Sequence, residues 1–205
     1  MAPPPPLTRI QAALLRASAE LTELNLPFAL VGGLAVSLRG EPRFTRDIDL
    51  AVSVASDRDA ESIILALQAK RYRVFLLVEQ ESVGRIATVR LQADAEEEEG
   101  VVVDLLFASC GIETELVHAA GRLEVLPGVV VPVARAGHLI AMKVLSRDDK
   151  QRPQDAGDLR SLIRSSAAVE LELAWQSVAL IEQRGFQRHR DLKAGLQRAI
   201  DDARD

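Results

Sequence analysis

Two acidic residues, Asp47 and Asp49, stand at alternate positions at the start of an apolar run that ends at Val52. Residues i and i+2 of an extended strand point to the same face of a sheet, so the two carboxylates are expected to project side by side. Neighbouring carboxylates repel each other unless a cation lies between them, and Mg²⁺ is a hard divalent ion that suits oxygen ligands. The pair indicates a metal site, although a solvated strand edge would also account for it.

The glycine pair Gly32-Gly33 follows the apolar segment Phe28–Val31 and precedes a short amphipathic segment, residues 34–38. A strand, a glycine pair and a helix N-terminus can bring backbone N–H groups close to an anion such as a phosphate. Glycine suits this place because it has no Cβ to block the approach and adopts positive φ at little cost. A phosphate-binding turn is one interpretation of the pair, and a plain tight turn is the other.

Asp104 is the one charged residue in the otherwise apolar run 101–107. An ionised carboxylate in the middle of a buried strand is costly unless it is paired or bound to a metal. If this strand lies beside that of Asp47 and Asp49, a third carboxylate joins the first two. The three acids are then the predicted metal ligands and catalytic residues, with Asp104 as general base towards an acceptor hydroxyl.

In the order of its motif residues, the chain resembles the DNA polymerase β-type nucleotidyltransferase superfamily; these residues are Gly32, Gly33, Arg43, Thr45, Asp47, Asp49 and Asp104. Within it, the chain is most similar to the AbiEii-like nucleotidyltransferases, the toxin components of type IV toxin–antitoxin systems. The resemblance covers residues 27–162. It implies an α/β (α+β) fold, with a small mixed sheet flanked by helices and followed by a C-terminal helical bundle.

The AbiEii-like subgroup has a second motif, in which a helix-borne lysine precedes a loop and an Asp-x-x-Asp-Leu segment; here the corresponding residues are Lys143, Arg152, Asp155, Asp158 and Leu159. Out of context, Lys143 could be a surface lysine whose stem packs on an apolar helix, and Asp155 could cap the helix that follows Pro153. Beside a phosphate site, a lysine is instead a suitable point charge for the β- and γ-phosphates. The resemblance therefore implies a catalytic and nucleotide-binding Lys143.

The residues assigned to nucleotide binding are Gly32, Gly33, Arg43, Thr45, Lys143 and Asp155. Arg43 either contacts the triphosphate or balances the charge of the aspartates, and both interpretations stay open. Arg46 has the same two interpretations, whereas Arg39 is expected to be a counter-charge only.

These residues predict a Mg²⁺-dependent nucleotidyltransferase that moves a nucleoside monophosphate from an NTP to a hydroxyl group. Two Mg²⁺ ions, held roughly 4 Å apart by the three aspartates, would stabilise the attacking and leaving oxygens of an in-line displacement. The glycine amides and Lys143 would neutralise the departing pyrophosphate. The resemblance further implies RNA, such as a tRNA 3′ end, as acceptor, and a cognate antitoxin as partner.

Two other functions remain open. One is nucleotidyl transfer to a small hydroxylated molecule, as in antibiotic-modifying relatives, and the other is a non-catalytic nucleotide-binding module. A groove lined with arginine would favour RNA, whereas a closed acidic pocket would favour a cationic aminoglycoside. Three filled acidic positions weigh against the non-catalytic alternative.

The elements that must position these residues follow from apolar patterning. A helix over residues 7–25 carries an apolar stripe, and another is expected over 57–70 with Ser56 or Asp57 as its cap. Residues 72–78 and 85–91 predict paired antiparallel strands, and the acidic run 94–99 predicts a solvated loop. With the strands already described, these elements predict a mixed, mostly antiparallel sheet.

The C-terminal part of the chain is expected to be helical after a short hairpin formed by residues 123–125 and 129–133 around Pro127-Gly128. The predicted helices cover residues 136–146, a segment from Asp155 onward, 167–184 and 189–203. We therefore divide the chain into an N-terminal nucleotidyltransferase domain, residues 1–134, and a C-terminal helical domain, residues 135–205.

Composition sets the remaining bounds. The chain has 205 residues, of which 48% are hydrophobic and 27% charged, as in soluble globular proteins. A net charge of −5 argues against a general nucleic-acid coat, but it permits a local basic groove. The single Cys110 excludes an internal disulfide and a multi-cysteine metal site. Because no apolar run has the length of a membrane span and no signal peptide is evident, we expect no membrane partner and a cytoplasmic location.

Overall fold

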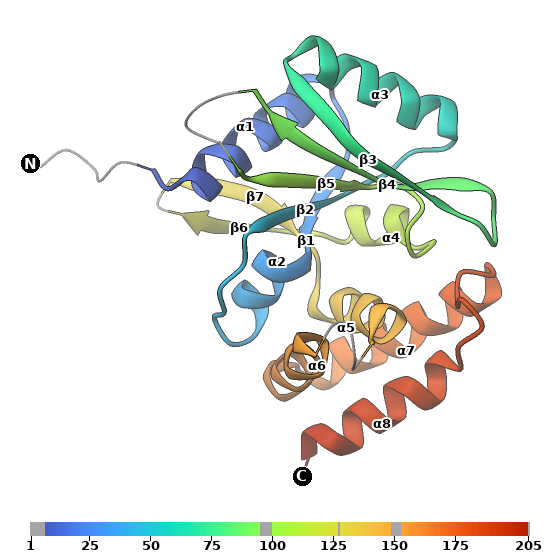
Figure 1. Ribbon diagram of the computed structural model, residues 1–205. Helices are drawn as coiled ribbons and strands as arrows, with labels where there is room; N and C mark the ends of the chain where they lie inside the picture. The colour runs from blue at the N-terminus through green and yellow to red at the C-terminus, as the bar shows by residue number, and fades with distance from the viewer. Residues whose placement is uncertain (1–6, 95–99, 127, 149–152, 205) are drawn as a thin grey trace, which may run out of the picture.

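A computed structural model describes residues 7–94, 100–126, 128–148 and 153–204. A mixed sheet of seven strands runs through the molecule in the order β3-β4-β5-β2-β1-β7-β6 (Figure 1). The strands are β1 (Phe28–Val31), β2 (Asp47–Val52), β3 (Tyr72–Gln80), β4 (Arg85–Ala93), β5 (Val102–Leu106), β6 (Gly121–Leu126) and β7 (Val129–Val133). The β1–β7 and β2–β5 pairs are parallel and the other neighbouring pairs are antiparallel, which confirms the predicted mixed, mostly antiparallel sheet.

Helices cover both faces of this sheet. Figure 1 shows α1 and α3 on one face, α2 and α4 on the other, and α5 to α8 gathered as a C-terminal bundle. The helices are α1 (Arg9–Glu23), α2 (Gly32–Arg39), α3 (Asp57–Ala69), α4 (Glu113–His118), α5 (Ala136–Ser146), α6 (Gln154–Ser165), α7 (Ala168–Gln183) and α8 (Leu192–Arg204). In the described part of the chain, none of them combines the length and apolar character needed to cross a bilayer.

Two helices on the first face begin with capping boxes. Thr8 accepts a hydrogen bond from the backbone of Gln11, whose side chain accepts one from the backbone of Thr8. Ser56 and Asp59 form the same reciprocal pair before α3. Each box satisfies N–H groups that a helix start otherwise leaves without partners, which fixes where the helix begins.

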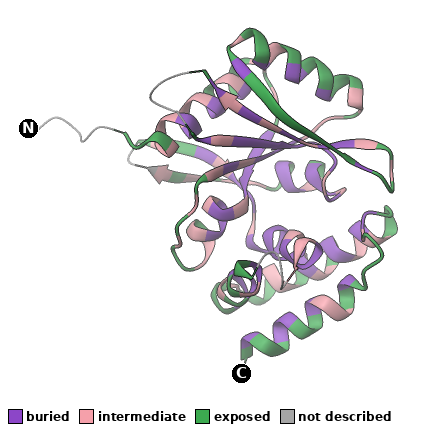
Figure 2. Cartoon of the chain, in the orientation of Figure 1, coloured by how far each residue is buried: buried purple, intermediate pink, exposed green. Residues whose placement is uncertain are grey.

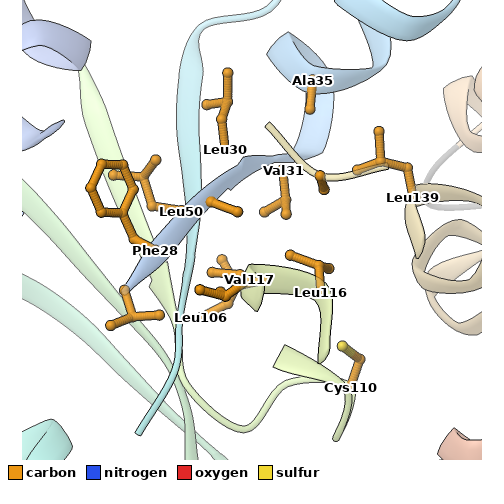
Figure 3. Close-up of a cluster of buried hydrophobic side chains, with 14 of the residues drawn as sticks. Phe28, Leu30, Val31, Ala35, Leu50, Leu106, Cys110, Leu116, Val117 and Leu139 are labelled. Atoms are coloured by element: carbon orange, nitrogen blue, oxygen red, sulfur yellow. The ribbon is translucent and has the colours of Figure 1, made fainter. Parts of the chain in front are cut away.

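The core is aliphatic, as the scarcity of aromatic residues requires. Buried side chains occupy the sheet and the inner faces of the helices, whereas β3 is exposed along most of its length (Figure 2). Part of this core contains side chains from the sheet, α2, α4 and α5, including Leu50, Ala35, Leu116 and Leu139 (Figure 3). Cys110 is buried in the same region as a free thiol.

The structure departs from the sequence-based expectations in a few places. Helix α4 was not predicted, and α2 begins at Gly32 itself instead of after the glycine pair. Pro153, not Asp155, stands at the N-cap position of α6, so the capping interpretation of Asp155 is wrong. Arg152 and Pro127 lie outside the described residues, as do residues 95–99 of the acidic run. The domain division between residues 134 and 135 stays a prediction.

Candidate active site

Four neighbouring strands place Arg90, Asp104, Asp49 and Val31 in one row across the sheet. Asp104 of β5 is the register partner of Asp49 in the parallel β2–β5 pair and of Arg90 in the antiparallel β4–β5 pair. On its other side, Asp49 is paired with Val31, the residue that precedes the glycine pair. The expected adjacency of the Asp104 strand and the Asp47–Asp49 strand is therefore present. Asp47, two residues before Asp49, points to the same face.

The glycine pair lies directly against Asp49. Gly32 has a φ of +63°, and a Cβ there would lie 1.9 Å from Oδ2 of Asp49. The N–H of Gly33 donates a hydrogen bond to the Asp49 carboxylate. A Cβ at Gly33 would come within 2.8 Å of the side chains of Arg43 and Thr45. Both glycines are thus needed for the close packing of this site, and their contact with a phosphate stays a prediction.

Gly32→Ala should destabilise the protein by about 2–4 kcal/mol, because it combines a strained φ with a clash against Asp49. Gly84→Ala is the matched control, since Gly84 has a φ of +60° and a Cβ added there would meet no atom within 4 Å. The control should cost only about 1–2 kcal/mol. Urea unfolding of both variants measures the difference, and equal losses would show that contact with Asp49 does not require glycine at position 32.

The surroundings of Asp49 favour its protonated form. Its pKa is raised to about 6, chiefly by burial and then by the negative charges of Asp104 and Asp47. The positive charge of Lys143 and the hydrogen bond from Gly33 act in the opposite direction. A cation bound beside Asp49 would offset the repulsion from Asp104 and Asp47 and would favour the ionised carboxylate.

The same shift predicts a pH-dependent stability in the absence of divalent ions. The folded state keeps the Asp49 proton to a higher pH than the unfolded chain, so stability is lost as the pH rises from about 4 to about 6. Asp49→Asn removes this loss and should raise the free energy of unfolding by about 1–3 kcal/mol at pH 8 relative to its effect at pH 4. Unfolding in EDTA between pH 4 and pH 8 measures these free energies. If the free energies of unfolding of the variant and the wild type differed by the same amount at every pH, the raised pKa of Asp49 would be contradicted.

Arg90 holds the carboxylate of Asp104 with two hydrogen bonds, from Nε at 2.9 Å and from Nη2 at 2.8 Å. Hydrogen bonding to Asp104 raises the pKa of Arg90 above its usual value, so the guanidinium stays charged. Asp104 itself is buried, and the Arg90 side chain is 42% exposed. Within the described residues, no three His, Cys, Asp or Glu side chains are grouped closely enough to hold a metal as they stand. Both Asp104 oxygens accept hydrogen bonds from Arg90.

Lys143 lies in a buried ion cluster between α5 and α6. Its ammonium is 2.7 Å from a carboxylate oxygen of Asp155 and 2.7 Å from one of Asp158. Arg43 binds Asp158 as well, at 2.7 Å, and Ser146 donates to Asp155. Lys143 is buried, so the surface-lysine interpretation is wrong. Its two carboxylate partners offset the cost of burying the ammonium.

Arg43 forms its ion pair with Asp158 and not with the strand aspartates. The interpretation of Arg43 as a counter-charge for Asp47 and Asp49 is therefore wrong. Arg39 donates hydrogen bonds to the backbone oxygens of Val133 and Ala134, so its role is structural. Its expected role as a counter-charge for the strand aspartates is wrong. A contact of Arg43 with a triphosphate stays a prediction.

A cavity of about 600 Å³ opens over these residues and has the size of a small-molecule site. Of the predicted site residues, those that line it are Gly32, Gly33, Arg43, Thr45, Asp47, Asp49, Asp104 and Lys143. Asp155 does not line the cavity. Its bond to Lys143 indicates that it positions that lysine, and direct nucleotide binding by Asp155 stays a prediction.

The cavity also contains residues that sequence reasoning missed, namely Thr88, Arg90, Ser109, Gln154 and Arg188. Thr88 and Arg90 alternate with the buried Val89 and Leu91, a pattern that reveals the polar face of a strand. That this face meets Asp104 could not be predicted from local patterning, because strand order is set by long-range packing. Ser109 and Arg188 come from loops and carry no such pattern.

Comparison with known proteins agrees with this geometry. The profile of the family described as "Nucleotidyl transferase AbiEii toxin, Type IV TA system" matches residues 13–205. No curated protein matches the sequence.

Two solved structures are similar to this chain. An antigenic nucleotidyltransferase-like protein from Paracoccidioides brasiliensis has a TM-score of 0.53 and 20% identity, over 94% of this chain and 95% of that one. ANT(2")-Ia in complex with adenylyl-2"-tobramycin has a TM-score of 0.51 and 20% identity, over 85% of this chain and 98% of that one. At such identities the likeness establishes the fold, and it confirms the nucleotidyltransferase-type architecture expected from the motif residues.

Proposed function

The chain belongs to the AbiEii nucleotidyl transferase family, and from this premise we propose that it transfers a nucleoside monophosphate from an NTP to a hydroxyl group of RNA. The observation that carries the proposal is the register of β1, β2 and β5. It sets Asp49 beside Asp104 and against Gly32, at the floor of a cavity large enough for a nucleotide. Charged groups of both signs then meet where a triphosphate and its counter-ions would lie.

Nucleotidyltransferases of this kind generally use a divalent metal, and the residues present fit Mg²⁺. The candidate ligands are the carboxylates of Asp47, Asp49 and Asp104, which are the oxygen donors that this ion prefers. Burial, and then the negative charges of Asp104 and Asp47, raise the pKa of Asp49, and a bound cation would favour its ionised form. When bound, a pair of such ions would stabilise the attacking and leaving oxygens of the displacement. A metal bound to Asp104 would compete with Arg90 for its oxygens.

The proposed step is an in-line displacement at the α-phosphorus. The acceptor oxygen forms a bond to this phosphorus, and the bond to the oxygen that bridges the α- and β-phosphates breaks. Pyrophosphate leaves with that oxygen and its electron pair. Asp104 takes the hydroxyl proton, while Lys143 and the glycine N–H groups supply positive charge on the side of the departing pyrophosphate.

An RNA acceptor is supported by the cations around the cavity. Arg43, Arg46, Arg90, Lys143 and Arg188 line it together with three aspartates. On a chain of net charge −5, this local basic lining can attract a polyanion. A cationic aminoglycoside would meet repulsion from the same groups. We also propose a cognate antitoxin as partner, because the family is described as part of a type IV toxin–antitoxin system.

Incubation of the protein with each labelled NTP, Mg²⁺ and total RNA tests the proposed function. We expect label on a discrete RNA band, released pyrophosphate, and no transfer in EDTA. The matched control is the same mixture with an aminoglycoside in place of RNA. Label that enters the aminoglycoside but not RNA would overturn the RNA assignment while leaving nucleotidyl transfer intact.

Arg90→Gln should make the protein more responsive to Mg²⁺. The substitution leaves the buried Asp104 without its bidentate partner, which should lower stability in EDTA by about 1–3 kcal/mol. It also frees two oxygens for an ion, so added Mg²⁺ should raise the Tm of Arg90→Gln more than that of the wild type. The matched control is Arg85→Gln on the same strand, whose arginine pairs with Asp57 at 2.6 Å outside the cavity. Equal Mg²⁺-induced shifts in all three proteins would refute competition between Arg90 and a metal for Asp104.

A further inference from the structure

Strand β3 exposes an unusually apolar edge. It is the outermost strand of the sheet and is paired only with β4. Five consecutive apolar residues, Val74 to Val78, are each 37–58% exposed, so neither face of the strand is covered there (Figure 2). A long apolar edge strand with unpaired backbone groups is a template for pairing with another strand. Proteins that stay monomeric usually interrupt such an edge with charges or proline, and this segment contains neither.

The charges that flank the apolar segment have opposite signs at its two ends. Arg71 and Arg73 precede it, and Glu79 and Glu81 follow it. All four side chains are exposed, and in the described part of the chain none of them forms an ion pair. Arg73 lies instead over the ring of Phe75, at 5.8 Å from its centroid.

We propose that β3 pairs with β3 of a second copy of this chain, antiparallel and centred on Leu76. In this register Arg73 lies opposite Glu79, and Arg71 and Glu81, which flank β3 just beyond its two ends, approach each other. Two-fold symmetry repeats both pairs, so four opposite-charge pairs enclose an apolar centre in which Val74 faces Val78.

The alternatives to this register are less favourable. A parallel pairing in register would set arginine against arginine and glutamate against glutamate, which is repulsive. A shift of the antiparallel register by one residue in each strand keeps at most one of the two kinds of charge pair. The pairing of β3 with β4 is irregular between Val74 and Leu76 and between Val78 and Glu79. The long stems of arginine and glutamate allow the charge pairs to form beyond these irregularities.

Such a dimer would join two seven-stranded sheets into one continuous sheet. It would also bring apolar side chains of the two copies into cross-strand contact and so remove part of their surface from water. Because β4 and β5 lie between β3 and the strand of Asp49, pairing at this edge leaves β2 and β5 unpaired with the partner.

Charge reversal with rescue tests the proposal. Sedimentation velocity of the full chain should show a concentration-dependent dimer. Arg73→Glu places two repulsive pairs in each dimer and should raise its Kd on the order of tenfold or more. The double variant Arg73→Glu/Glu79→Arg restores complementarity and should return the Kd towards that of the wild type. Arg160→Glu, an exposed reversal on α6, is the matched control and should leave the dimer unchanged.

Mixing gives a second and independent readout. Arg73→Glu and Glu79→Arg should each dimerise poorly alone but form a heterodimer with each other, since both cross-strand pairs are then complementary. Circular dichroism confirms that each variant is folded before mixing. A wild type that stays monomeric at its highest soluble concentration, or a double variant as weak as Arg73→Glu, would overturn the proposal.

Discussion

Asp104→Asn should lower the rate of nucleotidyl transfer by about 10³-fold or more while the protein stays folded. Asparagine keeps the shape of the side chain, but it is a poor ligand for a divalent ion and cannot take the proton of an acceptor hydroxyl. Loss of the general base alone is worth about 10²–10⁴-fold, and loss of a metal ligand adds to this. The measurement is the initial rate of labelled NMP incorporation into RNA at saturating Mg²⁺, with the Tm recorded for each protein.

Asp202→Asn is the matched control for this experiment. Its side chain is 59% exposed on α8 and lies 4.0 Å from Arg147. This separation is longer than the two hydrogen bonds, of 2.9 and 2.8 Å, that Arg90 donates to Asp104. We expect an unchanged rate for the control. If Asp104→Asn kept more than about a tenth of the wild-type rate, Asp104 could not be the proton acceptor proposed here.

Lys143→Met should destabilise the protein by about 3–5 kcal/mol, the cost of leaving buried carboxylates without their cation. Asp155 and Asp158 are both almost fully buried, and each has a carboxylate oxygen 2.7 Å from the Lys143 ammonium. Methionine fills the volume of the lysine stem without its charge, so the loss reports the ion cluster and not a cavity. For a chain of this size the expected fall in Tm is on the order of 10 °C.

Lys193→Met serves as the control for that loss, because Lys193 is 59% exposed and lies 3.3 Å from Glu182. Its effect should stay below about 1 kcal/mol, as for other surface ion pairs. Equal effects of the two substitutions would show that the buried cluster contributes no more than a surface pair. At a temperature where both variants are folded, Lys143→Met should also raise the KM for the NTP, which a purely structural lysine would not do.

Much of the site could be predicted from the sequence because its residues break local rules. Asp104 stands in an otherwise apolar strand, and Gly32 and Gly33 stand where a strand ends and a helix begins. Each break needs a reason beyond local folding, and together they indicate one site. The strand boundaries also followed from patterning, since Phe28–Val31 and Val129–Val133 were predicted with the bounds that the structure gives them.

The partners of these residues could not be predicted in the same way. Arg90 reaches Asp104 only because β4 and β5 pair in one particular register, and a slip of one residue would turn it to the opposite face. Asp155 and Asp158 are the ion-pair partners of Lys143 because of how α6 packs against α5. Helix α4 was missed because its six residues carry no side-chain cap and too few turns for a periodic pattern.

We propose that Asp47, Asp49 and Asp104 jointly hold Mg²⁺ for an NTP beside the glycine pair. Calorimetric titration of a non-hydrolysable NTP analogue into the wild type and Asp49→Asn, each with Mg²⁺ and with EDTA, is the decisive measurement. We predict tight binding by the wild type in Mg²⁺, and binding weaker by at least tenfold in EDTA or after Asp49→Asn, since EDTA removes the metal and the substitution removes a ligand proposed to hold it. Binding of equal affinity in all four titrations would contradict the claim.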